Sequence, residues 1–173
     1  TPVNIIQAGI AGDNAKGGLE RLERDVLCYS PDLVVVCFGL NDCCVEEEKI
    51  SRYLDSLKEI FEKIKKTFAE IIFMTPNMMN TYVSSLTFPE SAKSIAKNTC
   101  KLQNENVLEN LLDRAKELCI EENIPVCDVY GKWKMLYKNG VDTTELLANK
   151  INHPTRHMHW LFAGMLVNTM FEN

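Results

Sequence analysis

The sequence lacks the features that mark two large classes of protein. It carries 19 lysine and arginine residues against 24 aspartate and glutamate residues, which gives a net charge of -5. A protein that binds the phosphates of nucleic acid is normally basic, so nucleic acid is not the expected partner. The longest apolar runs, such as Leu33 to Leu40, are far shorter than the roughly 20 residues of a membrane-spanning helix. We therefore expect no membrane span.

Paired cysteines are also missing. None of the seven cysteines forms a Cys-x-x-Cys pair, so the sequence indicates neither a zinc knuckle nor a thioredoxin-like site. Several lie within apolar stretches, where a free cysteine acts as a small hydrophobic residue of a reducing compartment. We therefore expect mostly buried thiols. Cysteine usage favours the cytoplasm, but the sequence leaves the localisation itself unknown.

The nucleotide-binding glycine motifs are missing as well. The segment Ala8–Gly18 is rich in glycine, but its spacing is Gly-x-x-Gly, and no Gly-Lys-Ser/Thr follows. It therefore matches neither the dinucleotide-binding fingerprint nor a P-loop. A flavodoxin-like cofactor-binding protein remains an alternative without a phosphate loop to support it, and we expect no cofactor.

What is present is the composition of one globular domain. The chain has 173 residues, of which 46% are hydrophobic and 25% are charged, enough for a single core. We expect one domain over residues 1–173. The chain opens at Thr1, and Val3–Gln7 already has the pattern of a buried strand. A natural domain rarely opens with a core strand, so we expect that the domain is truncated at its N-terminus.

Short apolar runs alternate with helical spacing along the chain. The runs predict four strands, and the spacing predicts four helices. The predicted strands are 3–7, 33–38, 71–74 and 124–129, and the predicted helices are 19–26, 50–64, 102–118 and 155–171. Pro125 favours an edge position for the last strand. This alternation indicates a parallel sheet covered on both faces, with ligands bound beyond the carboxyl ends of the strands.

Two residues stand out at that predicted edge. Asn41 follows the most apolar strand, where its amide group is a suitable donor to an oxyanion, although an Asn-Asp turn explains it equally well. His153 lies in a loop before the last helix, a natural place for a general base. His153 and His157 have the i, i+4 spacing of metal ligands, but no acidic or cysteine ligand has supporting spacing. We expect no metal site.

Together these segments resemble the SGNH (GDSL-type) hydrolase superfamily, over nearly the whole chain from residue 3 to residue 171. Gly12 in Ala-Gly-Ile-Ala-Gly-Asp resembles the second-block glycine, and Asn41 in Gly-Leu-Asn-Asp resembles the third-block asparagine. His153 in Asn-His-Pro resembles the fifth-block histidine. The resemblance implies that Gly12 N–H and the Asn41 amide form an oxyanion hole and that His153 is the general base. It also implies a flavodoxin-like, three-layer α/β/α fold with strand order 2-1-3-4-5.

The first block of that family, Gly-Asp-Ser, has no counterpart in the sequence. Gly12-Asp13-Asn14 has asparagine where the serine would stand and belongs to the second block. The resemblance therefore implies that the nucleophilic serine and the central first strand lie upstream of Thr1. Either the second and third family strands close up, or another segment fills the slot. A neighbouring copy of the chain and a retained N-terminal peptide are the two candidates.

The last block departs from the family too. The family usually has aspartate three residues before the histidine, and Lys150 occupies that position here. Asn149 is the nearest polar residue that can orient the imidazole, and a backbone carbonyl would leave a Ser-His dyad.

The resemblance implies a serine esterase or acylhydrolase that cleaves a small acyl ester. Carbohydrate acetyl esters and short-chain lipids or thioesters are the candidate substrates, with a small acyl group on a polar carrier favoured. The alternative is a catalytically inactive ligand-binding domain, or a cleaved fragment, on the same fold.

Overall fold

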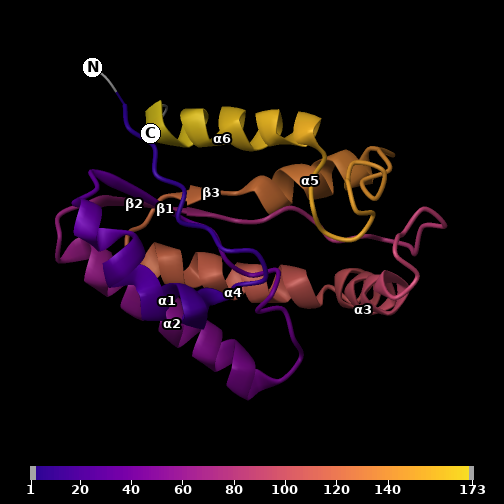
Figure 1. Cartoon of the computed structure of the whole chain (residues 1–173), viewed down its shortest axis with the longest axis horizontal. Helices are drawn as coiled ribbons and strands as arrows, with labels where there is room; N and C mark the ends of the chain where they lie inside the picture. The colour runs from indigo at the N-terminus through magenta and orange to yellow at the C-terminus, as the bar shows by residue number, and fades with distance from the viewer. Residues whose placement is uncertain (1–2, 172–173) are drawn as a thin grey trace.

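The computed structural model describes residues 3–171 and has three layers (Figure 1). The central layer is a parallel sheet, as the sequence predicts, and its three strands have the order β1-β2-β3. Its strands are β1 (Leu33–Val36), β2 (Glu70–Met74) and β3 (Val126–Cys127). One face carries α1 (Ala15–Asp25), α2 (Glu47–Lys65) and α4 (Val107–Glu121), and the other carries α5 (Val129–Lys138) and α6 (His159–Phe171). The remaining helices are α3 (Ala92–Asn104) and the 3-10 turns η1 (Leu27–Tyr29) and η2 (Arg156–Met158).

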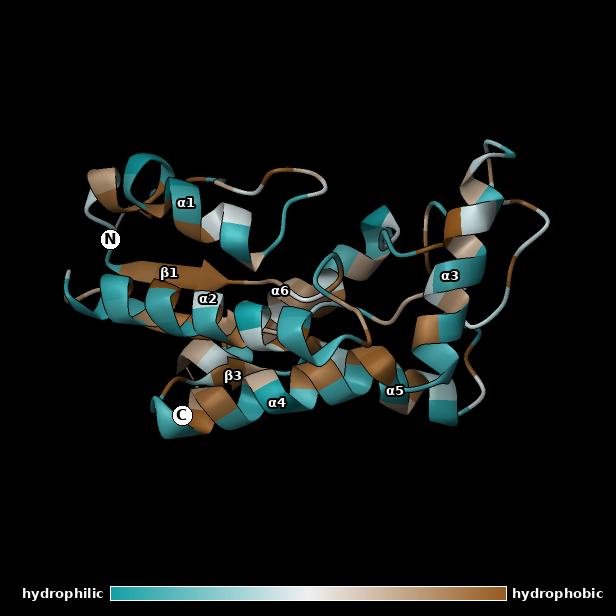
Figure 2. Ribbon diagram, turned by 90° about the horizontal axis from the view of Figure 1, so that it is seen from below, coloured by the Kyte–Doolittle hydropathy of each residue, from teal (hydrophilic) through white to brown (hydrophobic). Residues whose placement is uncertain are grey.

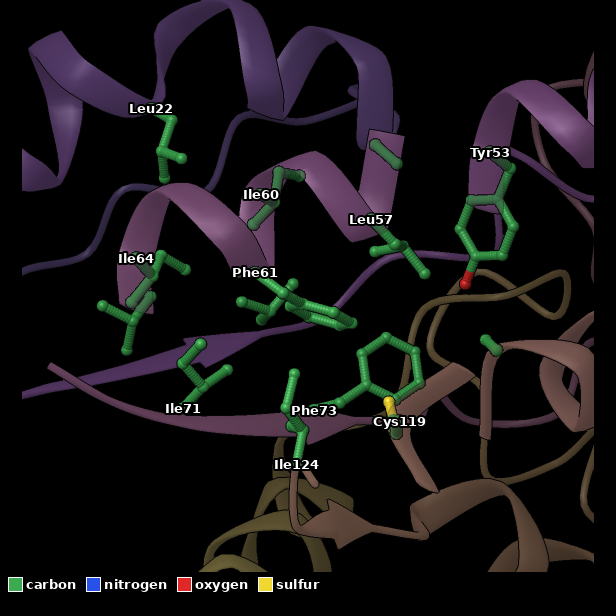
Figure 3. Close-up of a cluster of buried hydrophobic side chains, with 14 of the residues drawn as sticks. Leu22, Tyr53, Leu57, Ile60, Phe61, Ile64, Ile71, Phe73, Cys119 and Ile124 are labelled. Carbon is green, nitrogen blue, oxygen red and sulfur yellow. The ribbon is translucent and has the colours of Figure 1, made fainter. Parts of the chain in front are cut away.

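Helix α2 packs against the sheet in the layer formed by α1, α2 and α4. Its apolar residues recur three and four positions apart, so they form one stripe that faces inward. Leu57, Phe61 and Ile64 on this stripe are fully buried. The Phe61 ring meets the Phe73 ring of β2 edge-on, with centroids 6.2 Å apart (Figure 3). This packing fixes the sheet, and with it the loops at its carboxyl edge.

Strand β1 pairs on one side only. Leu33 to Val36 pair in parallel with Glu70 to Phe73 of β2, and no other residue within 3–171 pairs with β1. Figure 2 shows β1 as uniformly hydrophobic behind the hydrophilic outer face of α2. A strand this apolar is typical of the interior of a parallel sheet. Its position at an edge is therefore exceptional.

The strand predicted at Val3–Gln7 does not form. Figure 1 draws this segment as an indigo trace without a strand arrow, and Val3 and Ile5 are 82% and 86% exposed. The physical reason is that a strand needs a neighbour for its backbone hydrogen bonds, and apolar alternation does not supply one. It follows that this segment and β1 do not close up against each other.

Two helix predictions and one strand prediction need correction. The helix expected over 102–118 is two helices, because the chain turns at Asn106, whose φ is 59°. Helix α5 replaces the end of the strand expected to reach Val129, since the Asp128 side chain caps it by accepting from Gly131 N. The segment expected as one helix over 155–171 is η2 followed by α6.

Helix α6 is apolar on both of its faces. Its inner face packs on the core through Leu161, Phe162, Met165 and Leu166. Its outer stripe includes Trp160, which is 80% exposed, and Phe171, which is 76% exposed. A stripe of this kind normally faces a partner element.

The cysteines are less uniformly buried than expected. Cys119 and Cys127 are buried, but Cys28 and Cys37 are exposed. Cys37 directly follows β1, the strand at the edge of the sheet. None of the helices within residues 3–171 is long and apolar enough to cross a membrane.

Candidate active site

The loops at the carboxyl edge of the sheet contain the residues singled out from the sequence. In Figure 2 the arrowhead of β1 points towards this edge. Asn41 follows β1, and Gly12 lies in the loop that enters α1. The Asn41 Nδ2 atom donates a hydrogen bond to the Asp13 carbonyl at 2.8 Å. The structure therefore brings the Gly12 loop and the Asn41 loop together.

Both predicted oxyanion donors have a free N–H. Within residues 3–171, no acceptor receives the backbone N–H of Gly12. The Asn41 amide has two hydrogens, and among the described residues its nitrogen donates one bond. Both residues are exposed to solvent. Gly12 has a φ of +77°, a left-handed conformation that favours glycine.

Asp42 links the same two loops, and sequence reasoning missed it. Its Oδ1 atom accepts from Ala15 N at 3.0 Å, and its Oδ2 atom accepts from Gly39 N at 3.1 Å. Burial raises the pKa of Asp42, against the opposing effect of these two bonds. The sequence signal was an aspartate directly after Asn41, which has the ordinary appearance of a turn residue.

Arg21 of α1 holds the Gly12 loop through two hydrogen bonds. Its Nε atom donates to Asp13 Oδ2 at 2.7 Å, and its NH1 group donates to the Ala8 carbonyl. The Arg21 side chain is only 13% exposed. The two ends of the loop are therefore tied to one guanidinium of α1.

The His153 loop is held through its backbone. Asn149 Oδ1 accepts from the N–H groups of Ile151, Asn152 and His153, each at 3.0 Å. The His153 carbonyl accepts from Ala148 N at 2.7 Å. Asn149 thus contacts the backbone of His153. Within the described residues, no hydrogen bond involves the His153 ring.

Lys150 stands at the position of the family's aspartate and points elsewhere. Its φ is 57°, and its Nζ atom pairs with Glu145 Oε2 at 2.8 Å. Its ammonium group also donates to the Glu145 carbonyl at 3.1 Å. Lys150 therefore stabilises its own loop.

The segment after β2 anchors the His153 loop to the sheet, and this was not predicted. Asn77 Nδ2 donates to the Asn152 carbonyl at 2.9 Å, and Asn80 N donates to the Ile151 carbonyl at 2.8 Å. Asn77 and Asn80 are 2% and 0% exposed. Buried amides with several bonds each rigidify an irregular segment. The signal in the sequence was the concentration of asparagine between residues 77 and 80.

The predicted site is therefore assembled in two halves. One half joins Gly12 to Asn41, and the other fixes the backbone of His153 beside the segment after β2. Within residues 3–171, no hydrogen bond connects the His153 ring to Gly12, Asn41 or a serine. His157 and His159 are exposed, and the His159 ring lies 5.9 Å from that of Phe162. The described residues contain no cluster of three or more histidine, cysteine or acidic side chains suited to a metal ion.

Comparisons with known proteins agree on one family and one fold. The model of the GDSL-like Lipase/Acylhydrolase family matches residues 1–161. No curated protein matches the sequence. A catalytic mutant of Axe2, an acetylxylan esterase from Geobacillus stearothermophilus, is similar in structure, with a TM-score of 0.72 and 20% identity. The similarity covers 94% of this chain and 70% of that one.

Two further solved structures have the same fold. The acetyl xylan esterase AlAXEase has a TM-score of 0.65 at 18% identity, over 93% of this chain and 78% of that one. The lipase/acylhydrolase from Enterococcus faecalis has a TM-score of 0.57 at 24% identity, over 91% and 70% of the two chains. At these identities the likeness demonstrates the fold.

Proposed function

The chain belongs to the GDSL-like lipase/acylhydrolase family of ester-hydrolysing enzymes, and from this premise we propose that it cleaves a small acyl ester by a Ser-His mechanism. The observation that carries the proposal is the pairing of the Gly12 and Asn41 loops at the carboxyl edge of the sheet. This edge is where open parallel sheets bind their ligands.

His153 is the general base in this mechanism. A serine hydroxyl attacks the ester carbonyl carbon and transfers its proton to the His153 ring, which then protonates the departing alkoxide. Water then attacks the acyl carbon while His153 takes its proton; the bond between the serine oxygen and the acyl group breaks, and His153 returns the proton to the serine oxygen. The fixed backbone of the His153 loop and its solvent-exposed ring support this role.

Gly12 and Asn41 stabilise the tetrahedral oxyanion. The free backbone N–H of Gly12 and the second N–H of the Asn41 amide are both available at the edge. Their loops are in direct contact, so the two donors can converge on one oxygen. The loss of one such donor typically raises the barrier by about 2.7–4 kcal/mol.

The nucleophilic serine belongs to a strand that lies along the free edge of β1. Successive side chains of β1 point to opposite faces of the sheet: Val34 and Val36 are buried against α1 and α2, whereas Val35 on the opposite face is 37% exposed. The outer stripe of α6 supplies a second uncovered apolar surface. A strand parallel to β1 would end beside Asn41 and place its serine at the same edge. An N-terminal segment of the same polypeptide and a neighbouring copy are the two sources of such a strand.

The substrate class is an acetylated carbohydrate or another small acyl group on a polar carrier, such as a short-chain thioester. Two of the structural neighbours are acetylxylan esterases. The loops around Asn41 and Gly12 present exposed polar groups, which suit a polar carrier. A lipid with a short acyl chain is the less favoured member of the class.

A complementation experiment tests the mechanism. The chain is mixed with a synthetic peptide that forms an apolar strand ending in Gly-Asp-Ser, exposed to a fluorophosphonate and weighed by intact-mass spectrometry. We expect a serine adduct on the peptide in the mixture, together with hydrolysis of p-nitrophenyl acetate. The His153→Ala variant should abolish both, and a His157→Ala variant should retain them. No adduct and no hydrolysis with a peptide that demonstrably binds would reject the mechanism.

A specific observation favours a second function, that of a ligand-binding domain without catalysis. Within residues 3–171, the His153 ring has no hydrogen-bond partner, and Lys150 at the usual acid position pairs with Glu145. A catalytic histidine is normally oriented by a partner. Titration calorimetry with an acetylated xylo-oligosaccharide discriminates the two functions. Binding of unchanged ligand in the presence of the bound peptide supports the binding domain, and release of acetate supports the esterase.

A further inference from the structure

We propose that Asp42 is the positioning residue that fixes the two oxyanion-donor loops against each other; this inference rests on the proposed function of Gly12 and Asn41. The carboxylate accepts one hydrogen bond from each of two segments that are distant in sequence. Ala15 N, at the start of α1, donates to Oδ1, and Gly39 N, at the end of β1, donates to Oδ2.

The two donors flank the residues that the mechanism uses. Ala15 is three residues after Gly12, and Gly39 is two residues before Asn41. Asp42 is also the next residue in the chain after Asn41. A displacement of the Asp42 carboxylate would therefore move both proposed oxyanion donors, the Gly12 N–H and the Asn41 amide. Within residues 3–171, the bond from Asn41 to the Asp13 carbonyl is the second side-chain bond between the loops, after the bond between Ala15 N and Asp42. Two such bonds define the orientation of one loop relative to the other, whereas one alone permits rotation.

Gly39 has little freedom to compensate if this bond is lost. Its φ is +137°, and a Cβ at this position would lie 2.9 Å from the Leu112 side chain. The backbone here is therefore committed to a conformation that favours glycine, and its amide points at the Asp42 carboxylate. Gly39 is also buried, so water does not replace the lost acceptor.

The surroundings of Asp42 do not favour a negative charge. Burial is the largest effect on its pKa and raises it, and nearby Asp13 acts in the same direction. The phenol of Tyr53 and the thiols of Cys43 and Cys44, which also face this carboxylate, are neutral near pH 7, and their pKa values are raised. Among the described residues, the groups with the largest effects on the pKa of Asp42 are backbone amides and Asp13, and none of these is a cation. A carboxylate kept in an unfavourable place, with both oxygens bonded to backbone amides, is better explained by positioning than by stability.

Amide hydrogen exchange and proton NMR test the proposal on the chain itself. In the Asp42→Asn variant we expect the Ala15 and Gly39 amides to exchange about tenfold faster or more, the change expected for a lost bond to a charged acceptor. Asp32→Asn, which changes an exposed aspartate just before β1, is the matched control and should leave both rates unchanged. Unchanged exchange at both amides in Asp42→Asn would overturn the proposal.

The wild-type chain provides a second measurement that needs no variant. The Ala15 and Gly39 amide proton shifts should move together, with one midpoint, as acid protonates Asp42. Separate midpoints, or no titration, would contradict a shared acceptor. These readouts do not depend on the serine, so they distinguish failure of this inference from failure of the proposed function.

The catalytic consequence is measured in the complemented enzyme. We expect Asp42→Asn to lower kcat by about tenfold or more, as small misplacements of catalytic groups do, with KM little changed. The Asp42→Glu variant keeps the carboxylate but moves it by one methylene. It should therefore fold as the wild type does, with a kcat that stays below the wild-type value. An Asp42→Asn enzyme with the wild-type kcat would overturn the positioning role.

Discussion

The Asn41 side-chain amide donates to the Asp13 carbonyl at 2.8 Å across 28 residues of sequence. This bond joins the loop after β1 to the loop before α1, and each loop holds one proposed oxyanion donor. It occupies one hydrogen of the amide, and the other is left for a ligand. In the proposed mechanism, the Asn41 side chain therefore has two roles: it joins the two loops and it donates to the oxyanion.

Asn41→Ala should therefore reduce turnover strongly. The variant loses an oxyanion donor and a bond between the loops, so we expect kcat of the complemented enzyme to fall about 10²–10³-fold. The control is Asn98→Ala, which changes an exposed asparagine of α3 and should leave kcat unchanged. A loss smaller than about threefold would remove Asn41 from the oxyanion hole.

The effect of backbone strain at Gly12 can be distinguished from an effect on catalysis, because Gly140 has a similar backbone conformation. Gly12 has a φ of +77° and Gly140 has a φ of +85°, and a Cβ at either position meets nothing within 4 Å. Alanine at either site should lower the free energy of unfolding by about 1–2 kcal/mol, through backbone strain alone. Only Gly12→Ala should also lower kcat, since only Gly12 lies in the loop that bonds to Asn41 and is a proposed oxyanion donor. Equal activity of the two variants would show that Gly12 is a turn residue.

The sequence was sufficient to predict the elements that depend on local pattern. The run of β-branched residues before Cys37 and the stripe of α2 each bury an apolar surface, and both elements formed as predicted. The Gly12 and Asn41 motifs were also informative, because parallel strands bring their carboxyl ends to one edge. The structure places the two loops in contact.

What the sequence did not predict depends on distant partners. Val3–Gln7 has a strand pattern, but a strand also requires an adjacent edge, and pattern does not reveal whether one is available. The acceptors of Asp42 and Asn77 come from remote segments of chain. Helix α5 was missed because Asp128 lies within an apolar run that predicts a strand. Only the structure shows that its side chain accepts a hydrogen bond from Gly131 N and so caps a helix.

Val35→Arg tests the free edge of β1. A charged side chain on an apolar strand opposes burial against an incoming strand, so the variant should bind the Gly-Asp-Ser peptide at least about tenfold more weakly. The fold of the chain alone should be retained, because Val35 is already 37% exposed. Ile120→Arg, which changes a 75% exposed residue of α4, is the control. Undiminished peptide binding by Val35→Arg would place the incoming strand elsewhere.

Asn149→Ala should loosen the His153 loop. The variant removes the acceptor of three backbone N–H groups, and we expect the free energy of unfolding to fall by about 1–3 kcal/mol. Urea denaturation measures this change. Asn139→Ala is the control, because Asn139 Nδ2 donates to a single exposed carbonyl, that of Met135. If Asn149→Ala instead retains stability and alters only the pH profile of kcat, Asn149 acts on the imidazole.

The pH dependence of stability offers a separate view of Asp42. Burial raises its pKa above the ordinary 3.8, so the folded chain still holds this proton at pH values where the unfolded chain has lost it. The contribution of Asp42 to stability is therefore fully present below the ordinary pKa and is lost as the pH rises through the raised one.

Asp25 and Glu122 act in the opposite direction, because hydrogen bonds from Arg24 and Lys65 lower their pKa values. These opposing effects are common to the wild type and Asp42→Asn, so they cancel in the difference between the two. The free energy of unfolding of the wild type, minus that of the variant, should decrease as the pH rises from about 3.5 to about 7. A difference that is flat or that increases over this range would mean that the carboxylate is better stabilised than its burial implies, and that Asp42 contributes to stability as well as to position.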